Sequence, residues 1–404
     1  MSRYLIVSAD GHAGPPAPIY REYLDESFRE RFDEHQNNLT TTGMVPDSFV
    51  EEWDEETGDH DMLAAYDSDA RISVLDQEGV AAEVLFPDAD VLGTGRLAAS
   101  PFGSGLGSGQ DSEPDAIIAS ARAHNRWLAD FCALAPERRI GVAVIPVTAG
   151  IEEAVLEIKA AADLGLKGVM IPTRWFDQPA YMEPHYEPVW AACAEHDLVL
   201  HTHSGAGPAD YGLGPGIVSI YAAEAWWWAA RPFWVLLLSG AFERHPNLKY
   251  VIAENGAWWV PDLVARMDEK WIGGHNTRKF GDAFKNDLAR KPSEYVDEHC
   301  FFAASTPGQD EIDRRQAIGI GNLLWGNDLP HPEGTYPHTR YWINERFRDV
   351  PEDEARRILG TNAADLYRLD QAALAPLVDR IGPTVDEVHG PQPFPTPTGA
   401  GVVA

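Results

Sequence analysis

Short apolar runs rich in β-branched residues alternate along this chain with longer stretches in which apolar residues recur at helical spacing. This alternation predicts βα units and a parallel sheet. The predicted strands cover residues 4–9, 82–87, 141–146, 168–172, 198–201, 248–253, 300–304 and 322–326. The predicted helices cover 61–77, 115–134, 151–163, 187–195, 218–242, 259–271 and 310–318. Eight strands alternating with helices favour an α/β fold of the TIM type, a closed (β/α)8 barrel.

Three segments depart from this repeat. Residues 13–58 are rich in Pro, acidic and aromatic residues, and we expect an irregular insertion over the mouth of the barrel after the first strand. Residues 88–114 are rich in Gly and Ser, and a loop of this length suits a lid. We place the barrel domain at 1–381. The Pro-rich residues 382–404 are predicted to be an extended tail.

Composition excludes several classes of protein. Of the 404 residues, 44% are hydrophobic and 24% are charged, which is enough for a large core and argues against disorder. The net charge of −31 would repel phosphate backbones and anionic lipids, so neither nucleic acid nor membrane is an expected partner. The three cysteines give no disulfide framework. No signal-peptide region precedes the first strand, and we expect a cytoplasmic protein that acts on a small molecule.

Polar side chains follow three of the predicted strands. They are Asp10 and His12 after the first, His201 and His203 after the fifth, and Asp328 and His331 after the eighth. Each pair alone could be a satisfied polar group or a helix cap. Barrel enzymes, however, form their sites at the carboxyl ends of the strands, where these side chains would meet. A mixed nitrogen and oxygen set suits Zn²⁺ or a similar divalent ion with an open position for water or substrate.

The same segments resemble a known family, the amidohydrolase-related group of the amidohydrolase superfamily. This group includes aminocarboxymuconate-semialdehyde and hydroxybenzoate-type decarboxylases. The resemblance covers roughly residues 4–369, with matching motifs in order along the chain. These are Ser8-Ala9-Asp10-Gly11-His12, 76–80, 84–87, 125–128, 186–190, His201-Thr202-His203-Ser204-Gly205, 245–248 and 325–332.

The resemblance implies a TIM barrel with a single divalent ion, most simply Zn²⁺, held by Asp10, His12, His201 and Asp328. It also implies that Asp328 serves in proton transfer. Family members commonly carry a further His after the sixth strand, but this chain has Glu254 there. Glu254 could replace that His as acid or base, enter the metal sphere, or be structural. With Asp328 and His203 we take it as a candidate catalytic residue.

Three residues are candidate substrate contacts. Arg174, after the fourth strand, could clamp a carboxylate or lie on the surface. His331 could contact substrate or support the metal ligands. Trp227 belongs to a Trp-rich helix that could line the pocket or pack between subunits. Because that helix and the Pro-rich tail need burial, we expect a homo-oligomer.

These residues favour a metal-dependent hydrolase of a small aromatic or carboxylate-bearing substrate, in which Asp328 takes a proton from metal-activated water. The first alternative is non-oxidative decarboxylation of a small aromatic or enolic acid, with Asp328 protonating the carbon that loses CO₂. The second is a barrel without catalysis that serves in binding. The absence of a His after the sixth strand places hydrolysis ahead of decarboxylation.

Overall fold

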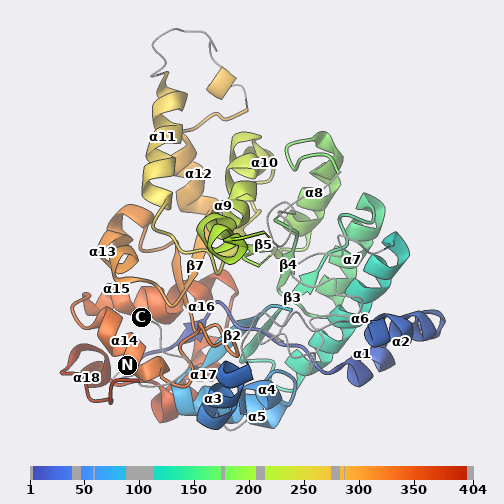
Figure 1. Ribbon diagram of the computed structural model, residues 1–404. Helices are drawn as coiled ribbons and strands as arrows, with labels where there is room; N and C mark the ends of the chain where they lie inside the picture. The colour runs from blue at the N-terminus through green and yellow to red at the C-terminus, as the bar shows by residue number, and fades with distance from the viewer. Residues whose placement is uncertain are drawn as a thin grey trace.

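Eight parallel strands follow one another in chain order around a nearly closed barrel, which confirms the predicted (β/α)8 fold (Figure 1). The computed structural model describes residues 3–38, 47–57, 60–87, 113–173, 178–205, 214–273, 283–285 and 287–397. The strands are β1 Val7–Ser8, β2 Ala82–Leu85, β3 Arg139–Val144, β4 Gly168–Met170, β5 Val199–His203, β6 Tyr250–Ala253, β7 Cys300–Ser305 and β8 Leu323–Gly326. Each lies within or next to a predicted run.

The barrel closes where the first and last strands meet. Each strand from β1 to β7 pairs in parallel with the next. Just beyond the ends of β1 and β8, Gly11 forms a parallel bridge with Leu329. The amide of Asp328 donates to the carbonyl of Asp10 at 2.9 Å. Two residues that are far apart in the sequence are therefore held side by side by the backbone.

Helices surround the barrel. They are α4 His60–Ala64, α5 Ser68–Glu78, α6 Pro114–Ala133, α7 Ile151–Asp163, α8 Glu187–Glu195, α9 Ile217–Leu238, α10 Ala241–Arg244, α11 Val260–Ile272, α12 Pro292–His299 and α13 Gln309–Ile318. The predicted helix 61–77 is divided because Asp67 caps the start of α5, accepting from the amide of Ala70 at 2.8 Å. The predicted helix 218–242 is divided at Gly240, which has a φ of 77°.

We expected an irregular insertion after β1, but the insertion is helical over much of its described length. It contains α1 Ala17–Tyr23, α2 Arg29–Asn38 and α3 Asp47–Thr57. Helix α1 packs on α6, where the hydroxyl of Tyr20 lies 2.7 Å from Nδ1 of the buried His124. Residue Phe32 is the buried residue of α2. Helix α2 is highly charged and shows little amphipathic pattern, which is why the sequence did not reveal it. The Gly-rich stretch 88–112 lies outside the described residues.

The C-terminal region adds α14 Thr339–Phe347, α15 Glu352–Arg356, a π-helical turn Arg357–Thr361, α16 Asn362–Leu366, α17 Gln371–Ile381 and α18 Val385–His389. The prediction of an extended tail is therefore wrong for α18. A capping box starts this helix, since Thr384 and Glu387 each bond the other's backbone amide. The side-chain amide of Asn344 on α14 donates to the carbonyls of Glu387, Val388 and Gly390, and these bonds hold α18 against α14.

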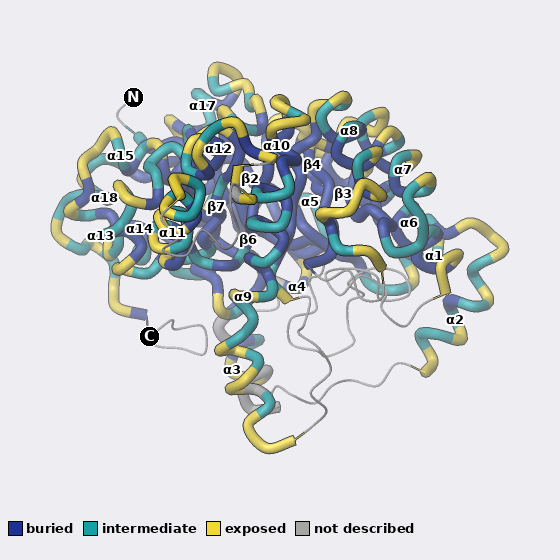
Figure 2. Tube along the Cα trace, turned by 90° about the horizontal axis from the view of Figure 1, so that it is seen from above, coloured by how far each residue is buried: buried dark blue, intermediate teal, exposed yellow. Residues whose placement is uncertain are grey.

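The core consists of the strands and the inner faces of the helices. Figure 2 shows buried residues along the strands at the centre and exposed residues on the surrounding helices. Strands buried on both faces read as continuous apolar runs, which is why they could be located from the sequence. Within the described part of the chain, none of the helices combines the length and apolar character needed to cross a bilayer.

Candidate active site

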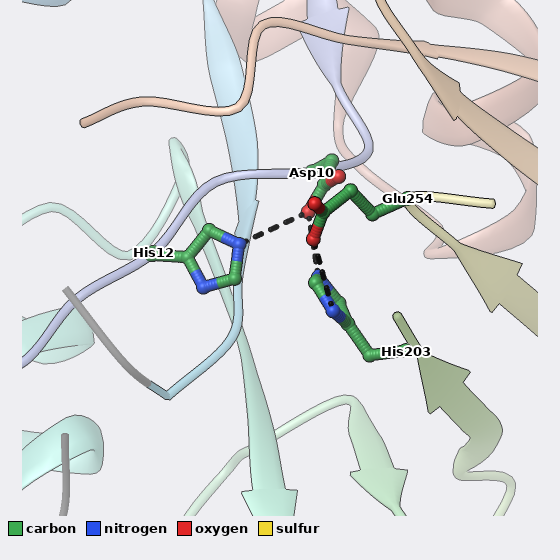
Figure 3. Close-up of side chains that lie close together, drawn as sticks. All are labelled: Asp10, His12, His203 and Glu254. Atoms are coloured by element: carbon green, nitrogen blue, oxygen red, sulfur yellow. Dashed lines mark hydrogen bonds and ion pairs between the residues drawn. The ribbon is translucent and has the colours of Figure 1, made fainter. Parts of the chain in front are cut away.

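Acidic and histidine side chains from several strand ends, all buried except the partly exposed Glu254, converge at the carboxyl end of the barrel. Figure 3 shows four of them pointing toward one another. Two sets of potential metal ligands overlap here, and within each set the ligand atoms all lie within 4.8 Å of one another. The sets are Asp10, His12, His203 and Glu254, and His12, Glu254, Asp328 and His331.

Asp10 lies at the centre of the first set. Its Oδ1 is 3.1 Å from Nε2 of His203 and 3.6 Å from Nε2 of His12. Its Oδ2 accepts a hydrogen bond from the hydroxyl of Ser305. Glu254 reaches the same place from the end of β6, with Oε2 3.3 Å from Nδ1 of His203. Side chains at the ends of β1, β5, β6 and β7 thus meet around Asp10 and His203.

The second set is centred on Asp328. Its Oδ1 lies 3.3 Å from Nε2 of His12 and 3.0 Å from Nδ1 of His331. Nδ1 of His12 is 2.9 Å from the carbonyl of Pro87. That carbonyl can only accept, so the proton of neutral His12 lies on Nδ1 and its Nε2 lone pair faces the cluster.

The cluster fits a divalent cation. Although buried, Nε2 of His12, Oδ1 of Asp328 and both ring nitrogens of His331 have no partner in hydrogen-bonding geometry. Buried polar atoms are almost always satisfied, so these unpaired atoms indicate a ligand. Imidazole nitrogens and carboxylate oxygens are the donors that Zn²⁺ and Mn²⁺ use in proteins. The hydrogen bond on Nδ1 of His12 is also the usual outer support of a metal-binding histidine.

The backbone is strained at two of these residues. Glu254 and Asp328 have φ values of 51° and 54°, in the left-handed region that is unfavourable for residues other than glycine. Such a conformation costs about 1–3 kcal/mol and persists where neighbouring structure enforces it. The amide of Glu254 donates to the carbonyl of Ala303 at 3.0 Å, and the amide of Asp328 is bonded to Asp10. The fold thus enforces the turn that aims each carboxylate into the cluster.

Arg71 on α5 supports the cluster from outside. It is fully buried and bonds Glu83 of β2, with Nη2 2.6 Å from Oε2. Its other N–H groups donate to the carbonyls of His12 at 2.8 Å and Leu329 at 3.4 Å. A side chain at Gly11 would place its Cβ 3.1 Å from Nη2 of Arg71, so this approach favours glycine there. Arg71 therefore fixes the segments that carry His12 and Asp328.

Burial and like charges favour the protonated forms of two carboxyl groups, those of Asp328 and Glu254. Burial raises the pKa of Asp328 to about 7, with Asp10 adding to the effect and His331 opposing it. Burial, followed by the charge of Asp328, holds the pKa of Glu254 well above its usual range. Burial opposes the charged form of His203, but Asp10 and Glu254 outweigh it and raise its pKa. A divalent cation bound by His203 and Glu254 would displace the protons of those two groups.

Comparison with known proteins now identifies the family. A family model described as amidohydrolase matches residues 67–369. The chain belongs to the amidohydrolase family. This confirms the resemblance, and the chain is an enzyme of that family.

Similar proteins of this family are decarboxylases. The gamma-resorcylate decarboxylase of Rhodococcus jostii is 24% identical over 284 residues, which are 64% of this chain and 79% of that protein. The gamma-resorcylate decarboxylase of a Rhizobium species is 26% identical over 280 residues, 63% of this chain and 78% of that protein. The prediction of a hydrolase finds no support among these relatives, which agree with the decarboxylase alternative.

Solved structures give the same fold. The dihydroxybenzoic acid decarboxylase of a Polaromonas species, solved with manganese and an inhibitor, has a TM-score of 0.64 and 20% identity. The comparison covers 92% of this chain and 99% of that one. The 5-carboxyvanillate decarboxylase of Sphingomonas paucimobilis has a TM-score of 0.62 and 21% identity, covering 91% and 99%.

Within this amidohydrolase, the structure does not bring the predicted ligand His201 into either set. Its Nε2 lies 2.7 Å from the hydroxyl of Tyr367 and its Nδ1 3.2 Å from the carbonyl of Val169. Burial lowers its pKa to about 3. His203, predicted as catalytic, occupies the place beside Asp10 instead. Both side chains point the same way, but His201 lies two residues, roughly 6.6 Å, deeper along the strand.

The predicted substrate contacts have different outcomes. His331 lies in the cluster. Trp227 on α9 is not brought to it, because its ring packs against Trp228, with centroids 4.8 Å apart, and against Arg231 at 5.4 Å. Arg174 lies outside the described residues. A single chain does not test oligomeric assembly or cytoplasmic location, which stay predictions.

Sequence analysis missed three residues. Arg71 looks like a surface cation on a helix, and Ser305 follows no distinctive motif. Tyr221 on α9 lies within electrostatic reach of the cluster, since burial and then the charge of Glu254 raise its pKa. One sequence feature could have pointed to Arg71. It is Gly11, between the candidate ligands Asp10 and His12, where the Arg71 side chain approaches the backbone closely.

Proposed function

We propose that this enzyme is a divalent-metal-dependent decarboxylase of a small hydroxylated aromatic acid. The observation that carries the proposal is the agreement of the curated relatives, which are gamma-resorcylate decarboxylases matching 63–64% of this chain. The cluster supports it, since a buried carboxyl group, Asp328, faces the metal-type ligands of β1. Decarboxylation needs both a group that holds the acid and a group that supplies a proton.

Asp10, His12 and His203 would hold the ion, with Glu254 in the same set. We propose Mn²⁺ rather than the Zn²⁺ expected from the sequence. Carboxylate oxygens suit Mn²⁺, and the similar Polaromonas enzyme was solved with manganese. When bound, such an ion would supply Lewis-acid chemistry, which would favour binding of the acid and withdraw electron density from its ring.

Asp328 would supply the proton. As the bond to the carboxylate breaks, its electron pair remains on the ring carbon, and that carbon takes the proton of Asp328. The products are CO₂ and the arene, and solvent returns one proton to Asp328. Burial raises the pKa of Asp328 to about 7, so the carboxyl group can carry a proton near neutral pH.

The test is a substrate panel with the manganese-loaded enzyme. We would supply hydroxylated benzoic acids and, as a counter-panel, aryl amides and lactones. The expected result is one CO₂ released for each acid consumed, measured by a coupled CO₂ assay beside chromatography of the arene. Cleavage of an amide or lactone, without CO₂ release from any acid, would overturn the proposal and restore the hydrolase.

A further inference from the structure

A cavity lies at the end of the barrel opposite the metal-type cluster. Its volume of about 510 Å³ is within the range of small-molecule sites. Residues at or just before the starts of β5, β6, β7 and β8 line it, together with residues of the C-terminal segment 357–368. Barrel enzymes carry their catalytic groups at the carboxyl ends of the strands, so this cavity is separate from the candidate active site.

Positive charge gathers in this cavity, although the chain as a whole has a net charge of −31. Lys249, Arg357 and Arg368 line it beside two carboxylates, Asp197 and Asp365. Arg368 forms an ion pair with Asp197, and its Nη2 also donates to the Asp197 carbonyl at 3.0 Å. Three cations against two carboxylates leave one positive charge in the lining. An anion with a single charge would balance it.

Arg357 has no acidic partner in the part of the chain that the structure describes. Its one hydrogen bond there runs from Nε to Oδ1 of Asn362 and is long, at 3.4 Å. A side chain at Gly321 would place its Cβ 2.6 Å from Nη2 of Arg357, so the guanidinium lies directly beside this glycine. Arg357 also begins the π-helical turn, and such turns are frequent at functional sites. Its unused N–H groups match a carboxylate, which a guanidinium binds through two parallel hydrogen bonds.

The rest of the lining supplies a second donor and an apolar wall. Nζ of Lys249 donates to the carbonyl of Glu298 at 2.6 Å, and an ammonium group has two further N–H donors. Phe301 of β7 and Leu366 of α16 are partly buried and pack on the core of the barrel. An apolar wall beside a few polar groups is the usual construction of a small-molecule site. The cavity therefore suits a ligand with a flat apolar body and an acidic end.

We propose that this cavity is a second binding site, for a small aromatic carboxylate. The acid group binds Arg357 and Lys249, and the ring lies against Phe301 and Leu366. A carboxylate carries the single charge that the lining balances, whereas a phosphate brings more charge close to the two carboxylates of the cavity. The proposal does not depend on the proposed function, because none of the residues of the two metal-ligand sets lines the cavity.

The experiment measures binding of para-fluorobenzoate to the purified full-length chain by ligand-observed fluorine NMR. We expect Arg357→Gln to weaken binding by about 10-fold or more, because the paired hydrogen bonds to the acid are lost. Gly321→Ala should also weaken it while keeping the charge, since the added methyl group takes the space beside Nη2 of Arg357. Arg266→Gln is the matched control and should bind as the wild type does, because Arg266 is 77% exposed on α11 and outside the cavity.

Acid bound at the metal cluster is common to all the proteins compared, so only their differences report the cavity. Equal binding by the wild type and Arg357→Gln would overturn the proposal, because the acid would then bind elsewhere. Weaker binding by Arg266→Gln to the same extent would also overturn it, since overall charge and not the cavity would decide binding. Release of CO₂ from any acid plays no part in these outcomes, so failure of this site and failure of the proposed function are seen separately.

Competition against the fluorinated probe tests the ligand class. Benzoate should displace the probe at least about 10-fold better than acetate or inorganic phosphate, because neither competitor has a ring to bury against the apolar wall. Acetate that competes as well as benzoate would overturn the aromatic part of the proposal. Phosphate that competes better than benzoate would overturn the assignment to a carboxylate.

Discussion

Two buried charged groups lie next to each other in this barrel, and they differ in how completely they are paired. Arg71 and Glu83 form a tight ion pair whose remaining N–H groups reach backbone carbonyls. In the neighbouring cluster, atoms of His12, Asp328 and His331 are equally buried and lie 3.0–3.3 Å apart as ion pairs, but none of these contacts has hydrogen-bonding geometry. A buried charge whose hydrogen bonds are complete can be structural, whereas buried polar atoms without a hydrogen bond indicate a missing ligand. The two regions therefore differ in whether their buried polar atoms have hydrogen bonds, and not in burial.

The sharpest test of this difference is Asp328→Asn. The amide keeps the size of the side chain but cannot carry the proton, so we expect kcat for decarboxylation to fall by about 10²–10⁴-fold. Free energy of unfolding should change little in comparison. Steady-state kinetics and urea unfolding check this. Asp262→Asn is the control for the same chemical change, because Asp262 is 80% exposed, and it should retain wild-type kcat. Full activity in Asp328→Asn would contradict the proton role.

Arg71→Met should have its main effect on stability. It leaves Glu83 charged and buried, and breaking such a pair costs about 3–5 kcal/mol. The double variant Arg71→Met/Glu83→Met should be less destabilised than Arg71→Met alone, because Glu83 no longer lies buried without Arg71, and the buried Arg139 beside Glu83 keeps its bonds to Ser68 and Phe131. Urea unfolding of the metal-free proteins measures both. A double variant that is as unstable as the sum of the single changes would mean that the pair is not coupled.

His203→Ala and His201→Ala compare two histidines of one strand. We expect His203→Ala to weaken Mn²⁺ binding by at least about 100-fold, because its ring faces Asp10. His201→Ala should leave binding much less affected and instead cost about 1–3 kcal/mol of stability, because the hydroxyl of Tyr367 loses its partner. Equilibrium dialysis and urea unfolding are the measurements. The reverse order of metal affinities would place His201 in the site.

A further test is the pH dependence of the stability of the metal-free protein. The pKa of Asp328 is raised to about 7 in the folded chain, above its ordinary value of 3.8. The folded state therefore binds more protons than the unfolded state between these values, and stability should fall as pH rises from about 4 to about 7. Unfolding in urea with a chelator would show this slope. Asp328→Asn should flatten it, and an unchanged slope in that variant would assign the effect to another group.

The sequence by itself determined the architecture and the general place of the site. Strands buried on both faces need continuous apolar runs, and each such run in this chain became a strand. The polar residues that end β1 and β8 could be assigned to one end of the barrel, because parallel strands share that end. Asp10, His12, Asp328 and His331 were found in this way, and the structure brings them together.

Only the tertiary structure decided which side chains reach one another. His201 and His203 have the same alternation, and the depth at which their strand sits in the barrel separates them. Glu254 enters the cluster through a left-handed turn at the end of β6, and Arg71 through the docking of α5 against β2. Strand pattern is a local property of the chain. The depth of a side chain in the barrel, the strain of its backbone and its buried ion pairs depend on contacts between residues that are far apart in sequence. These contacts exist only in the folded chain.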